Sequence, residues 1–168
     1  MLLVADSLRK LSFSKLMEVY AQSNRENGEN RYPWEPAGRQ LALAEEDFRE
    51  YLSRIFFTGE KARYFVLEEA GRYVSALRLE PFLDGLLLEA LETAPDLRKM
   101  GYAAALIRQT QRFLERQGPV RLYSHVVCGN TASLRTHEKC GFRQVLDYAR
   151  YIDGSVNRRA VTLLYDAE

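Results

Sequence analysis

The sequence is poor in the side chains from which proteins most often build covalent cross-links and metal sites. It has 168 residues but only two cysteines, Cys128 and Cys140, and only two histidines, His125 and His137. Two cysteines are too few for a disulfide framework or a four-cysteine zinc site, and two histidines add little. We therefore expect no bound metal, and we expect both cysteines and His125 to have packing roles.

The sequence also lacks an excess of charge and a long apolar segment. Lys and Arg total 24 against 23 Asp and Glu, so a net charge of +1 provides no global positive field to attract nucleic acid or an anionic membrane. The apolar run at the amino terminus ends at Asp6, and no segment approaches the roughly 20 apolar residues of a membrane span. These absences predict a cytoplasmic protein with neither a nucleic-acid nor a membrane partner.

The composition that remains is typical of one globular domain. Hydrophobic residues make up 46% of the chain and charged residues 28%. A domain commonly has roughly 100–200 residues, and one of this length buries about 70% of its unfolded surface without help from disulfides or metals. We therefore predict a single domain over residues 1–168.

The spacing of apolar residues predicts an α/β fold. We expect strands at residues 2–5, 63–68, 72–79, 86–93, 121–127, 142–151 and 159–165. We expect helices at residues 14–23, about 45–56, 101–117 and 131–139. Residues 24–40 contain three Asn, two Gly and two Pro, which favours a long loop. This order gives a mixed sheet with helices on its faces.

One stretch conflicts with the ordinary rules of helix formation. Arg98 and Lys99 precede the helix expected at 101–117, so two cations face the positive end of the helix dipole. A bound anion would resolve the conflict, because free backbone N–H groups and both side chains would point at negative charge. Gly101 and Ala103 lack bulk, so the backbone can approach a pyrophosphate closely. The alternative is a glycine near a helix start beside two solvated basic residues.

Two motifs together favour the anion site. Residues 98–103 read R-K-M-G-Y-A, which fits R-x-x-G-x-A directly after a strand, and residues 130–142 fit N-x-x-S-x-x-x-H-x-K-x-G-F. In order, spacing and placement these motifs resemble the GNAT superfamily of acetyl-CoA-dependent N-acetyltransferases, and the resemblance covers the whole chain. It implies a mixed, mostly antiparallel sheet of about seven strands, splayed between strands 4 and 5 and flanked by about four helices.

The resemblance implies where acetyl-CoA would bind. The residues expected to contact it are Leu91, Thr93, Arg98, Lys99, Met100, Gly101, Tyr102, Ala103, Asn130 and Ser133. The backbone of residues 98–103 would cradle the pyrophosphate, and the backbone of Leu91 and Thr93 would pair with the pantetheine arm as an added strand. Asn130 and Ser133 correspond to positions near the thiol, and Asn130 is also well suited to cap a helix.

Glu89 is the candidate general base. It lies in the segment L-E-A-L-E-T, which is similar to the L-E-G-I-x-V stretch in which family members use the glutamate to accept a proton from an amine. A carboxylate in so apolar a run is costly unless it is solvated or put to use, and simple solvation is the alternative. If the strand has no bulge, Glu89 shares a face with Leu91 and Thr93, while Glu92 faces solvent on the other side.

His137 is the candidate acid. By the resemblance, it takes the position at which the family usually has Tyr, the proposed proton donor to the departing thiolate. Asn130, Ser133 and His137 follow an i, i+3, i+7 spacing, so one helical face carries all three. Histidine can donate a proton near neutral pH, since its reference pKa is about 6.5. The alternative is that water supplies this proton.

The resemblance implies direct transfer of acetyl from acetyl-CoA to a primary amine of a small molecule in a ternary complex. The base takes the ammonium proton, and the amine attacks the thioester. Tyr32 and Trp34 would line the acceptor pocket or, alternatively, form a lid over the core. Other readings are acetylation of a protein or peptide, and a CoA-binding sensor without catalysis. A homodimer is a further expectation from the family.

Overall fold

The computed structural model describes residues 1–167 and has the expected α/β architecture. Its strands are β1 (Leu2–Ala5), β2 (Arg63–Glu69), β3 (Arg72–Phe82), β4 (Gly85–Thr93), β5 (Val120–Val127), β6 (Arg143–Leu146), β7 (Ala149–Arg150), β8 (Val156–Asn157) and β9 (Ala160–Ala167). Its helices are α1 (Phe13–Val19), α2 (Ala21–Arg31), α3 (Ala37–Arg54), α4 (Tyr102–Glu115) and α5 (Thr131–Lys139). Short 3-10 helices lie at Leu8–Lys10, Phe56–Thr58 and Pro95–Leu97.

Seven strands form one mixed sheet in the order β1-β2-β3-β4-β5-β9-β6, and β7 and β8 form a separate ribbon. Neighbours in the large sheet are antiparallel except β4 and β5, which run parallel. These two strands pair only where Leu86–Leu88 meet Leu122–Ser124. The expected splay between strands 4 and 5 is therefore confirmed. Among residues 1–167, no strand pairs with the β5-facing backbone of residues 89–93.

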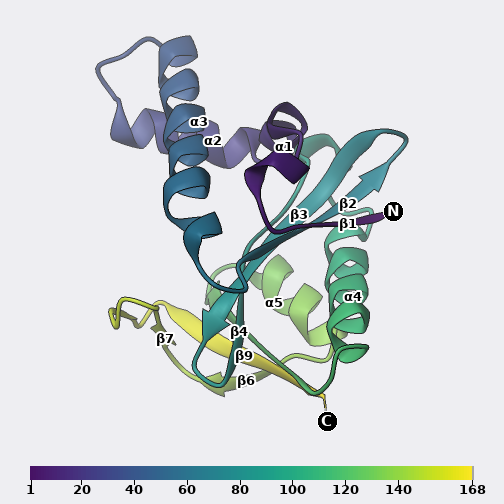
Figure 1. The fold of residues 1–168 in the computed structure, drawn as a ribbon. Coiled ribbons are helices and arrows are strands. Elements are labelled where there is room, and N and C mark those ends of the chain that lie inside the picture. Colours follow the sequence, from purple (N-terminus) through teal and green to yellow (C-terminus); the bar gives the residue numbers. More distant parts are fainter. Residues whose placement is uncertain (168) are drawn as a thin grey trace.

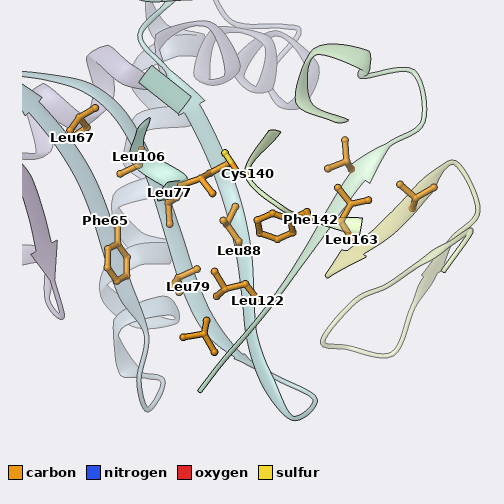
Figure 2. Packing of buried hydrophobic residues seen from close by; sticks show 14 of the residues in the cluster. Phe65, Leu67, Leu77, Leu79, Leu88, Leu106, Leu122, Cys140, Phe142 and Leu163 are labelled. Atoms are coloured by element: carbon orange, nitrogen blue, oxygen red, sulfur yellow. The ribbon is translucent and has the colours of Figure 1, made fainter. Parts of the chain in front are cut away.

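Helices cover both faces of this sheet (Figure 1). On one face, α4 and α5 pack over a core that includes Leu77, Leu88 and Leu106 (Figure 2). On the other face, α1 and α3 pack over a second core that includes Leu52. Each fully buried large side chain contributes roughly 1.5–3 kcal/mol, so these two cores hold β4 firmly in orientation. Leu88 packs in the first core. Because side chains alternate along a strand, its neighbour Glu89 points to the opposite face, toward α3.

The prediction of a long loop over residues 24–40 is wrong. Residues 21–31 form α2, and α3 follows after a connection of only residues 32–36. The α2 sequence is polar on every side, so it has no apolar stripe from which a helix can be recognised. The helix is held instead by close packing on α3, because a Cβ on Gly28 would lie 2.5 Å from the backbone carbonyl oxygen of Gln40.

The strand expected over residues 142–151 is divided into β6 and β7. Between them the backbone carbonyl of Tyr148 leaves the sheet ladder and accepts a hydrogen bond from the Thr162 hydroxyl at 2.7 Å. The turn expected at Asp153-Gly154 joins β7 to β8, and Gly154 there has a φ of 84°. Of the helices within residues 1–167, none combines the length and the apolar character that a membrane crossing requires.

Candidate active site

The loop before α4 presents unpaired backbone donors. Lys99 and Gly101 both have left-handed backbone conformations, with φ of 66° and 86°. In the described part of the chain, no acceptor receives a hydrogen bond from the N–H groups of residues 99–104. A Cβ added to Gly101 would meet no atom within 4 Å, so the space above this residue is open. Free N–H groups, an open approach and the positive end of a helix dipole are the features from which proteins build anion-binding sites, so this loop is the candidate anion-binding loop.

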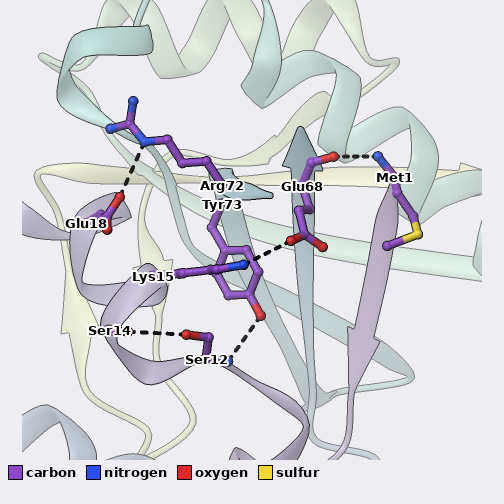
Figure 3. A network of polar contacts seen from close by, with 8 residues as sticks. All are labelled: Met1, Ser12, Ser14, Lys15, Glu18, Glu68, Arg72 and Tyr73. Carbon is purple, nitrogen blue, oxygen red and sulfur yellow. Dashed lines mark hydrogen bonds and ion pairs between the residues drawn. The ribbon is translucent and has the colours of Figure 1, made fainter. Parts of the chain in front are cut away.

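Ion pairs attach this loop to the first half of the chain. Arg72 of β3 donates to both carboxylate oxygens of Asp96 at 2.7 and 2.8 Å. It also pairs with Glu18 of α1 at 3.3 Å, as Figure 3 shows. The same network fixes α1 on the sheet, since Lys15 pairs with Glu68 at 3.2 Å. The loop conformation thus depends on the β2–β3 hairpin and α1 as well as on its own residues.

Two side chains of the loop point away from the open space. The Arg98 guanidinium is hydrogen-bonded to Gln22 of α2, and the Tyr102 hydroxyl donates to Glu69 at 2.7 Å. Their side chains are engaged by the protein, which leaves their backbone free for a ligand. Lys99 and Met100 are exposed.

The β4 strand contains a bulge directly after Glu89. Arg78 of β3 pairs with Glu89 and Ala76 pairs with Glu92, so β4 has one residue more than β3 over this interval. Ala90 takes the extra position in a left-handed conformation, with a φ of 49°. The bulge places Glu89 and Glu92 on the same face. The prediction that Glu92 turns to the opposite face and into solvent is therefore wrong, because it assumed regular alternation.

Glu92 lies half-buried under the start of α2. Burial raises the pKa of its carboxyl group, and a hydrogen bond with Ser23 opposes that shift. The Tyr20 hydroxyl donates to the backbone carbonyl of Ala90 at 2.7 Å, which holds the bulge against the end of α1.

Glu89 belongs to a compact group of charged and aromatic side chains. The Arg78 Nε atom donates to the Glu89 carboxylate at 3.3 Å, and its guanidinium carbon lies 4.8 Å from the centre of the Tyr51 ring. The carboxyl group of Glu80, two residues along β3 on the same face, is hydrogen-bonded to Glu89. Burial, this hydrogen bond and the charge of Glu89 raise the pKa of Glu80 to about 7.

The sequence predicts only one member of the acidic pair formed by Glu80 and Glu89. Glu89 was expected as a site residue, whereas Glu80 was not, because its position depends on the register of the β3–β4 hairpin. Near neutral pH Glu80 therefore gains or loses its proton beside the Glu89 carboxylate, which is paired with Arg78. Such a group can bind an ammonium ion and accept protons from it.

His137 is buried, with only 1% of the residue exposed. Its Nδ1 atom lies 2.8 Å from the backbone carbonyl of Ser133, which can only accept, so Nδ1 carries the proton. In the neutral ring Nε2 then accepts from the Ser124 hydroxyl at 3.0 Å. Burial lowers the pKa of His137 and favours this neutral form. The acid role predicted for His137 would require the ring to exchange these hydrogen bonds when a ligand binds.

Asn130 and Ser133 lie at the start of α5. The Asn130 side-chain oxygen accepts a hydrogen bond from the Ser133 N–H at 3.1 Å, so Asn130 caps the helix. Through its backbone carbonyl, Ser133 also holds the ring of His137. The structure therefore brings these three residues together on α5, as their spacing predicts.

Tyr32 and Trp34 are not brought to Glu89. They lie in the connection of residues 32–36, at the outer end of the α2–α3 pair and away from the sheet (Figure 1). Tyr32 donates to Asp47 at 2.6 Å, and Trp34 is 75% exposed. Because residues 21–31 form a helix rather than a loop, they carry both aromatic residues outward.

Comparisons with known proteins identify the family and the fold of the chain. Residues 16–142 match the Acetyltransferase (GNAT) family. Among solved structures, the ribosomal-protein-S18-alanine N-acetyltransferase from Escherichia coli superposes with a TM-score of 0.61 at 22% identity, covering 99% of this chain and 94% of that one. A chimera of spermidine N-acetyltransferase SpeG from Vibrio cholerae and hSSAT gives 0.61 at 19% identity, covering 97% and 93%. An acetyltransferase from Bacillus subtilis in complex with CoA gives 0.56 at 17% identity, covering 73% and 84%.

At these identities the structural likeness establishes the fold alone. No curated protein sequence matches this chain. Within residues 1–167, no group of three or more His, Cys, Asp or Glu side chains is arranged to hold a metal ion.

Proposed function

Because the chain belongs to the GNAT acetyltransferase family, we propose that it transfers acetyl from acetyl-CoA to a primary amine of a small molecule by direct attack in a ternary complex. One observation carries the proposal: the unpaired β4 segment, residues 89–93, has Glu89 at one end and leads into the anion-binding loop at the other. A ligand lying along this segment would have its phosphates at the loop and its reactive end beside a carboxylate.

The residues present suit acetyl-CoA. The unpaired N–H groups of residues 99–104 would receive the pyrophosphate, with the exposed Lys99 adding positive charge. The free backbone of Leu91 and Thr93 would pair with the pantetheine arm, and Asn130 and Ser133 would lie near the thiol. When bound, acetyl-CoA supplies a thioester carbon that an amine nitrogen can attack.

On the acceptor side, Glu89 would draw the ammonium group and take its first proton. Arg78 holds the Glu89 carboxylate in place, and backbone N–H groups near Thr93 would stabilise the negative charge that develops on the acetyl oxygen. A base matters most for a strongly basic amine. Deprotonating an alkyl amine of pKa about 10.4 at pH 7 costs roughly 4.6 kcal/mol, whereas an α-amine near 7.8 costs about 1 kcal/mol. An acidic site therefore suits an alkyl amine.

A protein or peptide amine is the second candidate acceptor. The observation that favours it is the position of residues 32–36, which lie at the outer end of α2 and α3 and do not close a pocket over Glu89. An open approach would admit a chain terminus. The protein would remain a direct acetyltransferase, with the same loop and the same base.

Two measurements on the unmodified protein test the proposal. Calorimetry should detect acetyl-CoA binding in the micromolar range, with CoA as a competitor. Release of CoA thiol should then be followed with alkyl polyamines, an aminoglycoside and short peptides with free amino termini. Turnover with an alkyl amine supports the proposal, and turnover with peptides alone selects the second candidate. Binding without turnover in any mixture would make the protein a CoA sensor, and absence of binding would remove all three.

A further inference from the structure

We propose that His125 is a second proton acceptor of this site, which takes a proton from the amine nitrogen as that nitrogen bonds to the acetyl carbon. The inference rests on the proposed function and adds a catalytic residue to it. From the sequence, His125 was expected to have only a packing role.

The position of His125 follows from the splay of the sheet. Leu88 and Ser124 form the last pair between β4 and β5, and Glu89 and His125 are the next residue on each strand. Since the strands are parallel and side chains alternate, both point to the face toward α3. His125 and Glu89 are close enough for the carboxylate charge to act on the imidazole. Glu89 and His125 therefore lie on either side of the point where β4 and β5 separate.

The imidazole of His125 has a nitrogen with no partner. Within residues 1–167, its Nε2 atom is buried and makes no hydrogen bond. Leaving a buried polar atom unpaired destabilises a folded protein, so such an atom calls for an explanation. A proton-accepting role accounts for it, because a base must keep its lone pair free until the substrate arrives.

Two aromatic rings orient His125 without using its nitrogens. The Phe82 ring packs edge-on against the imidazole, with 5.4 Å between the ring centroids. The Tyr151 ring, directly after β7, packs edge-on at the same centroid distance of 5.4 Å. His137 provides the contrast in the same chain, since both of its nitrogens are hydrogen-bonded. His137 is held in the core by hydrogen bonds, whereas His125 is held by aromatic rings and its Nε2 atom makes no hydrogen bond within residues 1–167.

The amine nitrogen gives up two protons during the reaction, and each must be received by some group. An ammonium ion loses one proton to become a nucleophile and a second one to become an amide. Glu89 would take the first, and His125 Nε2 would take the second as the C–N bond forms. The C–S bond then breaks, its electron pair leaves with sulfur, and the thiolate gains a proton. One proton thus ends on CoA and one in solvent, so the reaction balances.

A weak base is sufficient for the second step, because the nitrogen becomes much more acidic once it is bonded to the acetyl carbon. Burial lowers the pKa of His125, and the charge of Glu89 opposes this shift, so the ring is neutral and able to accept a proton at pH 7. Other charged groups on this face are Glu80, Arg78 and Glu92.

The test compares His125→Gln, His125→Phe and His125→Ala with the wild-type protein, using acetyl-CoA and whichever amine gives turnover. We expect kcat to fall about 10²-fold or more in all three, with the Kd for acetyl-CoA within about twofold of wild type. Added imidazole should restore part of the activity of His125→Ala, because it can enter the space left by the ring. A purely structural role would not produce this rescue.

The outcomes distinguish a failure of the role of His125 from a failure of the proposed acetyltransferase function. A kcat for His125→Gln close to that of wild type overturns the role of His125 and leaves the acetyltransferase intact. Loss of activity in His125→Ala without rescue, together with a matching fall in melting temperature, also overturns it. Absence of turnover by the wild-type protein overturns the proposed function itself, and this is recognised before any variant is made.

Discussion

The two ends of the unpaired β4 segment differ in the groups that they present: backbone N–H groups at one end and side chains at the other. The side that we propose binds CoA, residues 99–104, consists of backbone N–H groups whose direction depends on local conformation. The side that we propose binds the acceptor consists of the side chains of Glu80, Glu89 and His125, which lie on three neighbouring strands. A backbone site tolerates many side chains but depends on shape and charge. A side-chain site can lose its chemistry through the exchange of one atom without losing its shape.

The sharpest test of this contrast is Glu89→Gln. The change removes a proton acceptor and keeps the size of the side chain, so we expect turnover to fall roughly 10²–10⁴-fold with little change in the Kd for acetyl-CoA. Steady-state kinetics and calorimetry on the same samples measure both quantities. Glu46→Gln, at an exposed position on α3, is the control for loss of one negative charge. Equal activity of Glu89→Gln and wild type across pH 6–9 would assign the proton to another group.

On the CoA side, Gly101→Glu should have the opposite signature. A side chain at a φ of 86° costs roughly 1–2 kcal/mol, and a carboxylate in the open space repels a phosphate. We expect the Kd for acetyl-CoA to rise about 10²-fold, with kcat at saturation much less affected. Gly101→Asn is the matched variant, because Asn tolerates this conformation and carries no charge. Tight binding by the Glu variant would show that the phosphates lie elsewhere.

The same difference decides what could be predicted from the sequence. Six consecutive residues encode the backbone site, so the motif at 98–103 marks it directly. The acceptor side depends on register, which no local pattern contains. Glu80 becomes part of it only because Arg78 pairs with Glu89, and Glu92 changes face only because of the bulge at Ala90. Likewise, the polar α2 carries no periodic signal, since tertiary packing at Gly28 holds it.

Glu80→Gln probes the titration of Glu80 on the acceptor side. Burial and Glu89 raise the pKa of Glu80 to about 7, from an ordinary value of 4.5. As pH rises through about 7, Glu80 loses its proton and adds a negative charge to this group, so we expect the KM for a cationic amine to fall about tenfold, which is ~1.4 kcal/mol. In Glu80→Gln this step should be absent. A pH profile unchanged by the substitution would mean that the charge of Glu80 does not act on the amine.

Ionisation of Glu80 has the opposite effect on stability: it should favour amine binding but weaken the folded state. A carboxyl group whose pKa is raised by folding destabilises the folded state once it is ionised. Relative to the wild type, Glu80→Gln should therefore make no difference below pH 4.5 and should gain stability as pH rises from 4.5 to about 7. Melting temperatures of both proteins over this range measure the effect.

His137→Phe compares the two histidines. The substitution leaves the Ser124 hydroxyl and the Ser133 carbonyl without their partner, so we expect a loss of about 1–3 kcal/mol in the free energy of unfolding. Because neither nitrogen of His137 has a free proton to give, kcat should stay within about tenfold of wild type. Denaturant titration and steady-state rates test the two halves. A 10²-fold loss of rate that His137→Tyr restores would establish His137 as the acid instead.

The smallest effect is expected at the bulge that divides the two sides. Ala90 has a φ of 49°, a conformation that costs an L-residue roughly 1–2 kcal/mol and glycine almost nothing. Glycine loses more backbone entropy on folding, by about 0.4–1 kcal/mol, so Ala90→Gly should stabilise the protein by roughly 0.5–1 kcal/mol, or about 2 °C in melting temperature. Ala105→Gly in α4 is the matched control and should destabilise by a similar amount, because glycine disfavours a helix. If Ala90→Gly also destabilises, the strand is regular at this position. Glu92 would then return to the opposite face, and the acceptor side would lose the geometry on which its assignment depends.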